Sequence, residues 1–571
     1  MPRFVVRFLR WPKERAADRF FALGLASAYV LLLLGTVRDL GYARDEGFYF
    51  HAARSYEAWF DLLLRSPQQA LQKSTIDAYW SANHEHPALM KSLFALSHKF
   101  LFSSWHVFTH PGTAYRFPGM LVSSMAVALV YSWGSRVYGR AAGLIAAVSL
   151  GMMPRVFYHS HLACFDMPVA AMWLVTTYAY WCSLRKKGLV WPVITGVLYG
   201  LLLNTKHNAW LLPGALAAHF VLTEHRKLWQ ELKRGRLPIP SVFFAMLLIG
   251  PPIFYAGWPW IWHDTLERLS AYARFHLQHE YYNMEFLGRT YWKPPMPRLY
   301  APLMTAATVP AVTLALFGIG LFDGFRTRRA DASSASDPAS ASDPASSTNH
   351  DDRRSALVLW VVCMLASYAP WLSTDTPIFG GTKHWITAYP FLCLFAAGGF
   401  AFASQRLRDL FAQKLRRPGW IEACLALSVT LGPVVMTLHS HPWGLSAYTP
   451  LVGGAPGAAS LGLNRTFWGY TTGSLQAYLN EHVPAGARVY VHDTALQSWE
   501  LMQQDGRIRS DLSGTLDIAS SDVALYHDEP HMGRVEYQIW VAYGTVTPTE
   551  VRSYDGVPVV WLYERPSVNS R

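Results

Sequence analysis

Long runs of uncharged, mostly apolar residues recur along the chain, and short gaps that carry charge separate them. Most runs approach the ~20 residues that a helix needs to cross the hydrocarbon core of a bilayer. The pattern therefore predicts a polytopic α-helical membrane protein with about eleven transmembrane helices. The expected spans cover residues 20–37, 117–135, 141–154, 167–184, 188–205, 209–223, 237–262, 299–322, 355–374, 385–404 and 423–438.

Basic residues are concentrated in alternate gaps between these spans. Every second gap is basic, as the positive-inside rule requires of cytoplasmic loops. We therefore expect the N-terminus to lie in the cytoplasm, followed by a retained first span, and the C-terminal part to lie outside. The basic gaps contain Arg136, Arg185, Arg226, Arg326 and Arg406, among others.

The apolar runs divide the chain into two predicted domains. Residues 1–438 form a transmembrane catalytic domain, in which residues 331–352, a Ser/Ala/Asp/Pro repeat, are expected to be a disordered cytoplasmic linker. The two long outer segments, 38–113 and 263–298, mix aromatic and charged residues, which is typical of helices lying along the interface. Residues 439–571 lack apolar runs and are expected to form a small α/β domain on the outer face.

Short patterns within residues 439–571 predict its elements. A helix is expected between two of the strands, over residues 496–504. Four strands are expected, at residues 488–492, 522–526, 538–543 and 557–563.

Composition agrees with a membrane protein. Hydrophobic residues make up 51% of the chain and charged residues only 15%, whereas soluble domains carry about 25% charged residues. The net charge of +12 would suit a nucleic-acid partner, but the basic residues cluster in the gaps and no nucleic-acid motif is present, so none is expected. The five cysteines form no CxxC or disulfide pattern.

Two acidic sites are candidates for catalysis. Asp45 and Glu46 are adjacent and directly follow the first span, so they lie at the outer boundary, where a positioned carboxylate can act as a general base. An ordinary solvated pair is the alternative. Asp166 opens the fourth span. It either caps that helix or supplies a further carboxylate to the same site.

Basic residues at outer span ends predict an anion site. Arg116, Lys206 and Lys383 with His384 all fall there, in a chain whose short-gap basic residues lie mostly inside. Interfacial anchoring is the alternative for Arg116. For Lys206 with His207 and for Lys383 with His384, the alternative is a solvated pair on the outer face. Together they indicate an outer-leaflet pocket for an anionic lipid head group beside the carboxylates.

Histidines in the outer segments raise the question of a metal. His84, Glu85 and His86 are consecutive, and His279 lies three residues after His276. Such groups bind divalent metals, but an extended chain points alternate side chains in opposite directions. Phosphate binding by His86 and interfacial packing are the alternatives. A divalent metal is possible on this pattern, and no cofactor is certain.

The motifs in this order resemble the C-type superfold of membrane glycosyltransferases (GT-C), in the group of dolichyl-phosphate-mannose protein mannosyltransferases and lipid A aminoarabinose transferases. Asp45-Glu46 resembles the family's Asp-Glu motif in the first outer loop. His86-Pro87-Ala88-Leu89 resembles its (His/Lys)-Pro-Pro-Leu motif, with Ala88 in place of the second proline.

The resemblance implies an inverting glycosyltransferase that takes its sugar from a polyprenyl-phosphate donor on the outer face. It implies that Asp45 is the base for the acceptor hydroxyl, that Glu46 orients it, and that Arg116 and Lys206 hold the lipid phosphate. His86 matches a position that helps to bind metal and phosphate. We expect a bacterial inner membrane; the acceptor is a protein, a lipid or a polysaccharide. A transporter or flippase of lipid-linked glycans is the alternative.

Overall fold

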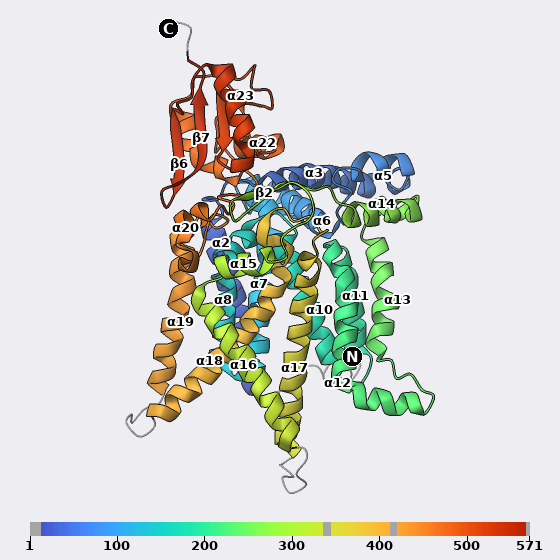
Figure 1. Cartoon of the computed structure of the whole chain (residues 1–571). Coiled ribbons are helices and arrows are strands. Elements are labelled where there is room, and N and C mark those ends of the chain that lie inside the picture. The colour runs from blue at the N-terminus through green and yellow to red at the C-terminus, as the bar shows by residue number, and fades with distance from the viewer. Residues whose placement is uncertain (1–12, 335–343, 412–418, 567–571) are drawn as a thin grey trace.

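The computed structural model describes residues 13–334, 344–411 and 419–566, and it consists mainly of a bundle of long helices (Figure 1). Within these described ranges, five helices are long and apolar enough to cross a membrane, and the number rises to seven if each of two bent helix pairs is one span. The five are Ala16–Thr36, Pro111–Tyr138, Asp352–Leu372, Ile386–Phe411 and Trp420–Ser440.

Every expected span overlaps a helix, but the spans at residues 141–154, 237–262 and 299–322 are interrupted or begin outside a helix. The bent pairs are α8 with α9, at 67°, and α15 with α16, at 118°. The bundle consists of α2 (Lys13–Thr36), α7 (Pro111–Tyr138), α8 (Arg140–Gly151), α9 (Pro154–His161), α10 (Asp166–Ser183), α11 (Val190–Leu203), α12 (Leu212–Lys233), α13 (Ser241–Ala256), α15 (Tyr300–Thr308), α16 (Ala311–Ser334), α17 (Pro344–Tyr368), α18 (Tyr389–Phe411) and α19 (Gly419–Ser440).

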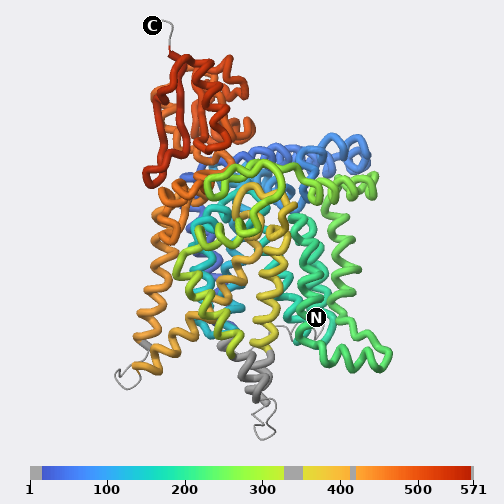
Figure 2. The backbone as a smooth tube through the Cα atoms, viewed as in Figure 1, coloured from blue at the N-terminus to red at the C-terminus, as the bar shows by residue number. Residues whose placement is uncertain are grey.

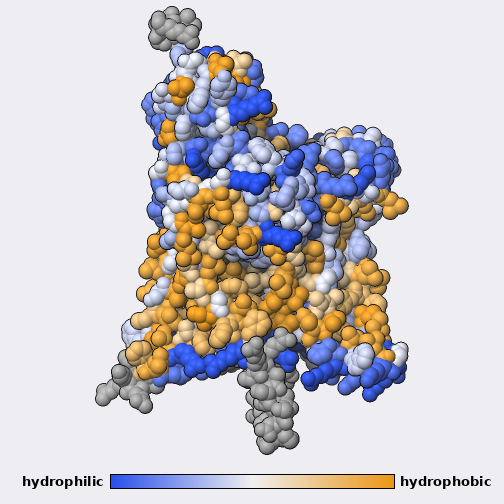
Figure 3. All heavy atoms as spheres, viewed as in Figure 1, coloured by the Kyte–Doolittle hydropathy of each residue, from blue (hydrophilic) through white to orange (hydrophobic). Residues whose placement is uncertain are grey.

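On the face shown in Figure 3, an apolar belt covers the bundle between two polar ends. Large apolar side chains point outward from its peripheral helices, as Phe20, Leu247 and Leu427 show. Such a surface is stable only in a lipid environment. The chain is an integral membrane protein, and the expected helical fold class is confirmed.

Helices α3 (Arg44–Arg65), α5 (Lys73–Trp80) and α14 (Thr265–Leu277) lie across one end of the bundle, which we call the site face (Figures 1 and 2). They come from the two segments expected to run along the interface. Helix α3 buries Phe50, Tyr56 and Trp59, so its aromatic side holds it against the bundle. Helix α6 (Leu89–Ser97) packs against α3 and α7 beneath it.

A five-stranded sheet stands on the site face (Figure 1). Its order is β4-β3-β5-β7-β6; β3 is parallel to β4 and β5, and β7 is antiparallel to β5 and β6. The strands are β3 (Arg488–Tyr490), β4 (Ser513–Thr515), β5 (Val523–His527), β6 (Glu550–Tyr554) and β7 (Val557–Glu564). Helices α20 (Gly454–Ser460), α21 (Gln476–Glu481), α22 (Leu496–Gln504) and α23 (Gly533–Tyr543) complete this part, and β1 (Met284–Phe286) and β2 (Arg289–Tyr291) form a separate hairpin.

The expected strand at residues 538–543 is wrong, because this segment is the second half of α23. A short apolar run fits a strand and a helix equally well, and only its packing distinguishes them. Ile539 and Tyr543, four residues apart, are buried against β5 and β7. The expected helix at residues 496–504 coincides with α22.

The linker expected to be disordered, at residues 331–352, contains helical residues at both of its ends. Helix α16 continues to Ser334 and α17 begins at Pro344, so both helices extend into residues 331–352. Residues 335–343 lie outside the described part of the chain.

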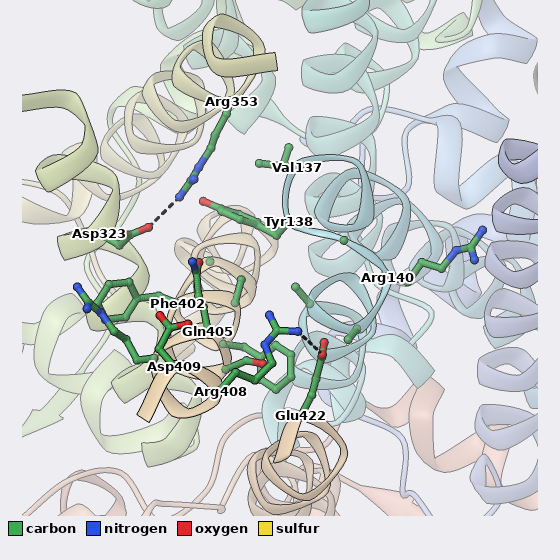
Figure 4. Close-up of a pocket in the computed structure, with 18 residues that line it drawn as sticks. Val137, Tyr138, Arg140, Asp323, Arg353, Phe402, Gln405, Arg408, Asp409 and Glu422 are labelled. Carbon is green, nitrogen blue, oxygen red and sulfur yellow. Dashed lines mark hydrogen bonds and ion pairs between the residues drawn. The ribbon is translucent and has the colours of Figure 1, made fainter. Parts of the chain in front are cut away.

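A cavity of about 600 Å³ opens at the end of the bundle opposite the site face (Figure 4). Ion pairs between Arg353 and Asp323 and between Arg408 and Glu422 lie along its wall. None of the candidate site residues lines it. The candidate chemistry therefore lies elsewhere, beneath α3.

Candidate active site

A buried ion pair fixes the start of α3. Both Glu46 and Arg116 are fully buried. The Arg116 guanidinium donates to the two Glu46 carboxylate oxygens, at 2.8 and 2.7 Å. The same carboxylate accepts the backbone N–H of Ala43 at 2.9 Å and that of Ala163 at 2.9 Å. Glu46 therefore joins the first turn of α3 to α7 and to the loop before α10.

Arg116 has no N–H left for a phosphate. Its remaining donors reach the backbone oxygens of Val37 at 3.1 Å, Leu40 at 3.3 Å and Gly41 at 2.7 Å, so all five are used. In this structure the guanidinium has no free donor for a lipid phosphate, and the predicted phosphate contact of Arg116 stays a prediction. Its role in the structure is to shape the loop that leads into α3.

Asp45 faces the other way from its neighbour Glu46. Its side chain is 21% exposed, and Lys383 Nζ lies 3.2 Å from its Oδ2. The Lys383 ammonium also lies 4.3 Å from the centre of a Trp468 ring, so the indole face holds it beside the carboxylate. Asp45 is thus a positioned carboxylate at the surface of a charged cluster.

Asp166 and Lys206 form a second pair, with Lys206 Nζ 2.6 Å from Asp166 Oδ1. Asp166 is the first residue of α10, and the N-cap position before it is Phe165. His159 Nδ1 lies 3.6 Å from its other oxygen. The carboxylate is therefore engaged by side chains across the site, and the capping alternative does not describe it.

His86 lies beside this pair among aromatic rings. Its ring centre is 5.3 Å from that of Phe165 and 5.6 Å from that of His276. Burial, together with the positive charge of Lys91 and Lys206, holds the pKa of His86 well below its usual range. A neutral imidazole binds a phosphate by donating one hydrogen bond rather than by charge.

The remaining candidates do not converge on a metal. His84 Nδ1 contacts the backbone oxygen of Ser81, at 2.8 Å, Glu85 accepts from Asn83, and His279 stacks on Phe379. Among the described residues no group of three His, Cys, Asp or Glu side chains is arranged to hold a metal.

His384 is engaged by the backbone of Phe379. The Phe379 N–H donates to its Nε2 at 3.0 Å, and the ring packs against Trp371 at 4.4 Å. It contributes to the local packing of η5 (Gly381–His384).

The C-terminal part supplies site residues that the sequence analysis did not assign. Arg44 pairs with Asp493, with 2.6 Å between Nη1 and Oδ1, and its backbone N–H donates to the Trp468 oxygen at 2.8 Å. Ser498 donates to the Ala43 oxygen at 3.0 Å. These contacts hold the two residues that precede Asp45. Trp468 lies at φ 59°, a costly conformation for a bulky residue that is found at functional positions.

Replacing Asp493 by asparagine is expected to slow the sugar transfer that the motifs imply about two- to fivefold. A rate change of this size corresponds to the free energy that a surface ion pair contributes. Without its partner, Arg44 is free to move from its present 4.0 Å to a closer contact with Asp45, which weakens that carboxylate as a base. The measured quantity is kcat, and the unfolding temperature of the variant should equal that of the unmodified protein. Asp511→Asn, which removes a surface pair with Arg509, is the control; an equal effect of both changes would contradict the role of Asp493.

Comparison with known proteins gives one family match. Residues 99–255 match the model described as dolichyl-phosphate-mannose-protein mannosyltransferase. This segment includes Arg116, Asp166 and Lys206. The comparison with curated protein sequences gives no match. The family match confirms the resemblance inferred from the motifs and supports a membrane glycosyltransferase of this type.

Two solved structures align with most of this chain at low sequence identity. ArnT from Cupriavidus metallidurans bound to undecaprenyl phosphate is 14% identical, with 95% of this chain and 97% of that chain covered and a TM-score of 0.45. The oligosaccharyltransferase AglB from Archaeoglobus fulgidus, in complex with an inhibitory peptide and a dolichol-phosphate, is 10% identical, with 92% and 72% covered and a TM-score of 0.45.

Proposed function

We propose that the protein transfers a sugar from a polyprenyl-phosphate donor to an acceptor hydroxyl, with inversion, at the site face. The observation that carries this proposal is the pairing of a partly exposed carboxylate, Asp45, with Lys383, next to the buried Asp166–Lys206 pair. The motif resemblance and the family match supply the reaction type. The basic gaps at the opposite end favour an outward-facing site, which we assign to a bacterial inner membrane.

In this mechanism Asp45 accepts the proton of the acceptor hydroxyl as its oxygen attacks the anomeric carbon. The bond to the lipid phosphate breaks on the opposite face of the sugar, which inverts the configuration. Negative charge develops on the departing phosphate, and a cation that meets it there lowers the barrier. Lys206 supplies that charge and His86 a hydrogen bond. Glu46 positions Asp45 through α3.

Replacing Lys206 by methionine is expected to reduce kcat/KM by about 10²–10³, the usual cost of removing one group that stabilises developing charge. The assay measures transfer from a defined polyprenyl-phosphate sugar by protein in detergent. Lys73→Met is the matched control, because Lys73 is an exposed lysine of the same face, paired with Asp264. Equal rates for both variants and the unmodified protein would contradict phosphate binding by Lys206.

A transporter of lipid-linked glycans is the second candidate, and one observation favours it. The bent pairs α8–α9 and α15–α16 resemble the interrupted helices of transporters. Labelled lipid in proteoliposomes distinguishes the two functions. Movement across the bilayer without an acceptor would support transport, whereas sugar transfer in detergent, where no membrane separates two compartments, would support the enzyme.

A further inference from the structure

Arg155 is a buried cation with unused donors. It lies in the first turn of α9, directly after the bend from α8, and is 1% exposed. Its Cζ lies 5.0 Å from the ring centre of Tyr448 and 5.4 Å from that of Phe467. Within the described part of the chain its Nε and Nη2 have no hydrogen-bond partner.

This arrangement is costly for the protein alone. A buried charge without hydrogen-bonded counter-charge loses its hydration and gains little in return, and aromatic faces compensate only part of the loss. Arg116, equally buried, uses all its donors and has Glu46 as counter-ion. In a membrane protein, an ionisable residue kept at such a cost points to a ligand.

A second group without a hydrogen bond lies one helical turn away, with its Nδ1 3.6 Å from Asp166 Oδ2. His159 is 2% exposed, and neither ring nitrogen has a hydrogen-bond partner among the described residues. It lies in the electrostatic range of Asp166, Lys383, Arg155 and Lys206. His159 therefore connects Arg155 to the proposed reaction centre.

Arg155 and Lys206 contact different surroundings. Lys206 forms an ion pair with Asp166. Arg155 instead packs against Tyr448 and Phe467, which precede the C-terminal sheet. The backbone of Gly381 approaches it closely, since a Cβ placed there would lie 3.3 Å from Nη1. The two cations thus contact different parts of the site.

We propose that Arg155, with His159 beside it, binds an oxyanion of the substrate: a carboxylate or phosphate carried by the transferred sugar or by the acceptor. The guanidinium fork fits such a group in a bidentate manner, and the ligand supplies the hydrogen-bonded counter-charge that no described residue provides. The inference rests on the proposed function, since it names the class of substrate that this same site accepts.

The first test measures ligand binding by the full chain in detergent, with glucuronate as the anionic probe and glucose as the neutral one. Glucuronate is expected to raise the unfolding temperature and glucose is not. In Arg155→Met the apparent affinity for glucuronate falls about 10- to 100-fold, the range for hydrogen bonds to a charged group. Without probe, Arg155→Met is expected to unfold at the same or a higher temperature, which a purely structural arginine would not do.

Matched variants separate this site from the phosphate site. Arg268→Met removes another arginine of the site face, one that is paired with Asp77, and should leave glucuronate binding unchanged. If Lys206→Met abolishes glucuronate binding and Arg155→Met does not, the anion site belongs to Lys206 and the inference fails while the proposed function stands. Arg155→Lys, which keeps the charge but not the fork, should be intermediate. Misfolding of both Arg155 variants would show a structural role and overturn the inference.

Transfer assays then identify the source of the anion. Donors with a hexose or a hexuronic acid on undecaprenyl phosphate are compared in membranes that contain the native acceptor. A loss in Arg155→Met confined to the hexuronic acid donor places the anion on the sugar, and an equal loss with both donors places it on the acceptor. Unchanged rates with both donors overturn the inference. No transfer by the unmodified protein would instead count against the proposed function.

Discussion

Asp45→Asn is expected to lower kcat for sugar transfer by about 10²–10⁴, the usual contribution of a positioned general base. Asparagine has nearly the shape of aspartate and keeps an oxygen for Lys383, which lies 3.2 Å from Asp45 in the structure. It cannot accept the proton of the acceptor hydroxyl. The loss should therefore appear in kcat, measured with saturating donor and acceptor, and not in the binding of the donor.

The control for this change is Asp39→Asn. Asp39 lies six residues earlier, is largely exposed and pairs with His441, so its replacement removes a carboxylate from the same face without touching the site. Unfolding temperatures of both variants should match that of the unmodified protein. Full transfer by a folded Asp45→Asn protein would rule out Asp45 as the base.

Glu46→Gln is expected to reduce the free energy of unfolding by about 3–5 kcal/mol, the cost of breaking a buried ion pair. The change leaves the Arg116 charge in a fully buried position with no anion beside it. It also weakens the acceptors for the N–H groups of Ala43 and Ala163. Thermal or denaturant unfolding in detergent measures the loss.

A double variant tests the reason for that loss. Glu46→Gln with Arg116→Met removes both charges, so part of the stability should return. Glu57→Gln, on the same helix but at a half-buried pair with His98, should cost clearly less. If the double variant were as unstable as the sum of the two single variants, the pair would not be the cause.

The sequence was sufficient to predict the membrane fold, because long apolar runs are needed to cross the hydrocarbon core and basic residues gather in the cytoplasmic loops. It also identified Asp45, Lys206 and Lys383 as members of one face. It did not predict that Arg116 is saturated by Glu46, since adjacent acids look alike in a sequence. Helix geometry turns Asp45 to the surface and Glu46 to the core, and only the packed structure shows this difference.

The contributions from the C-terminal part were also beyond the reach of the sequence. Asp493 and Trp468 lie more than 400 residues from Arg44 along the chain. Arg155 directly follows the apolar run at residues 141–154, and in the sequence it looks like an ordinary charged residue at the end of a span. Its significance depends on what surrounds it, and that required the positions of Tyr448 and Phe467.

The link between Arg44 and Asp493 has a consequence for biogenesis. The two residues are 449 positions apart, so the surroundings of Asp45 are completed only after almost the whole chain has been synthesised and its last part has folded. A nascent chain whose helices are already inserted would still lack the contacts that position the Asp45 carboxylate. Activity would then begin with the docking of the C-terminal sheet, and incomplete chains in the membrane would not consume the lipid-linked sugar.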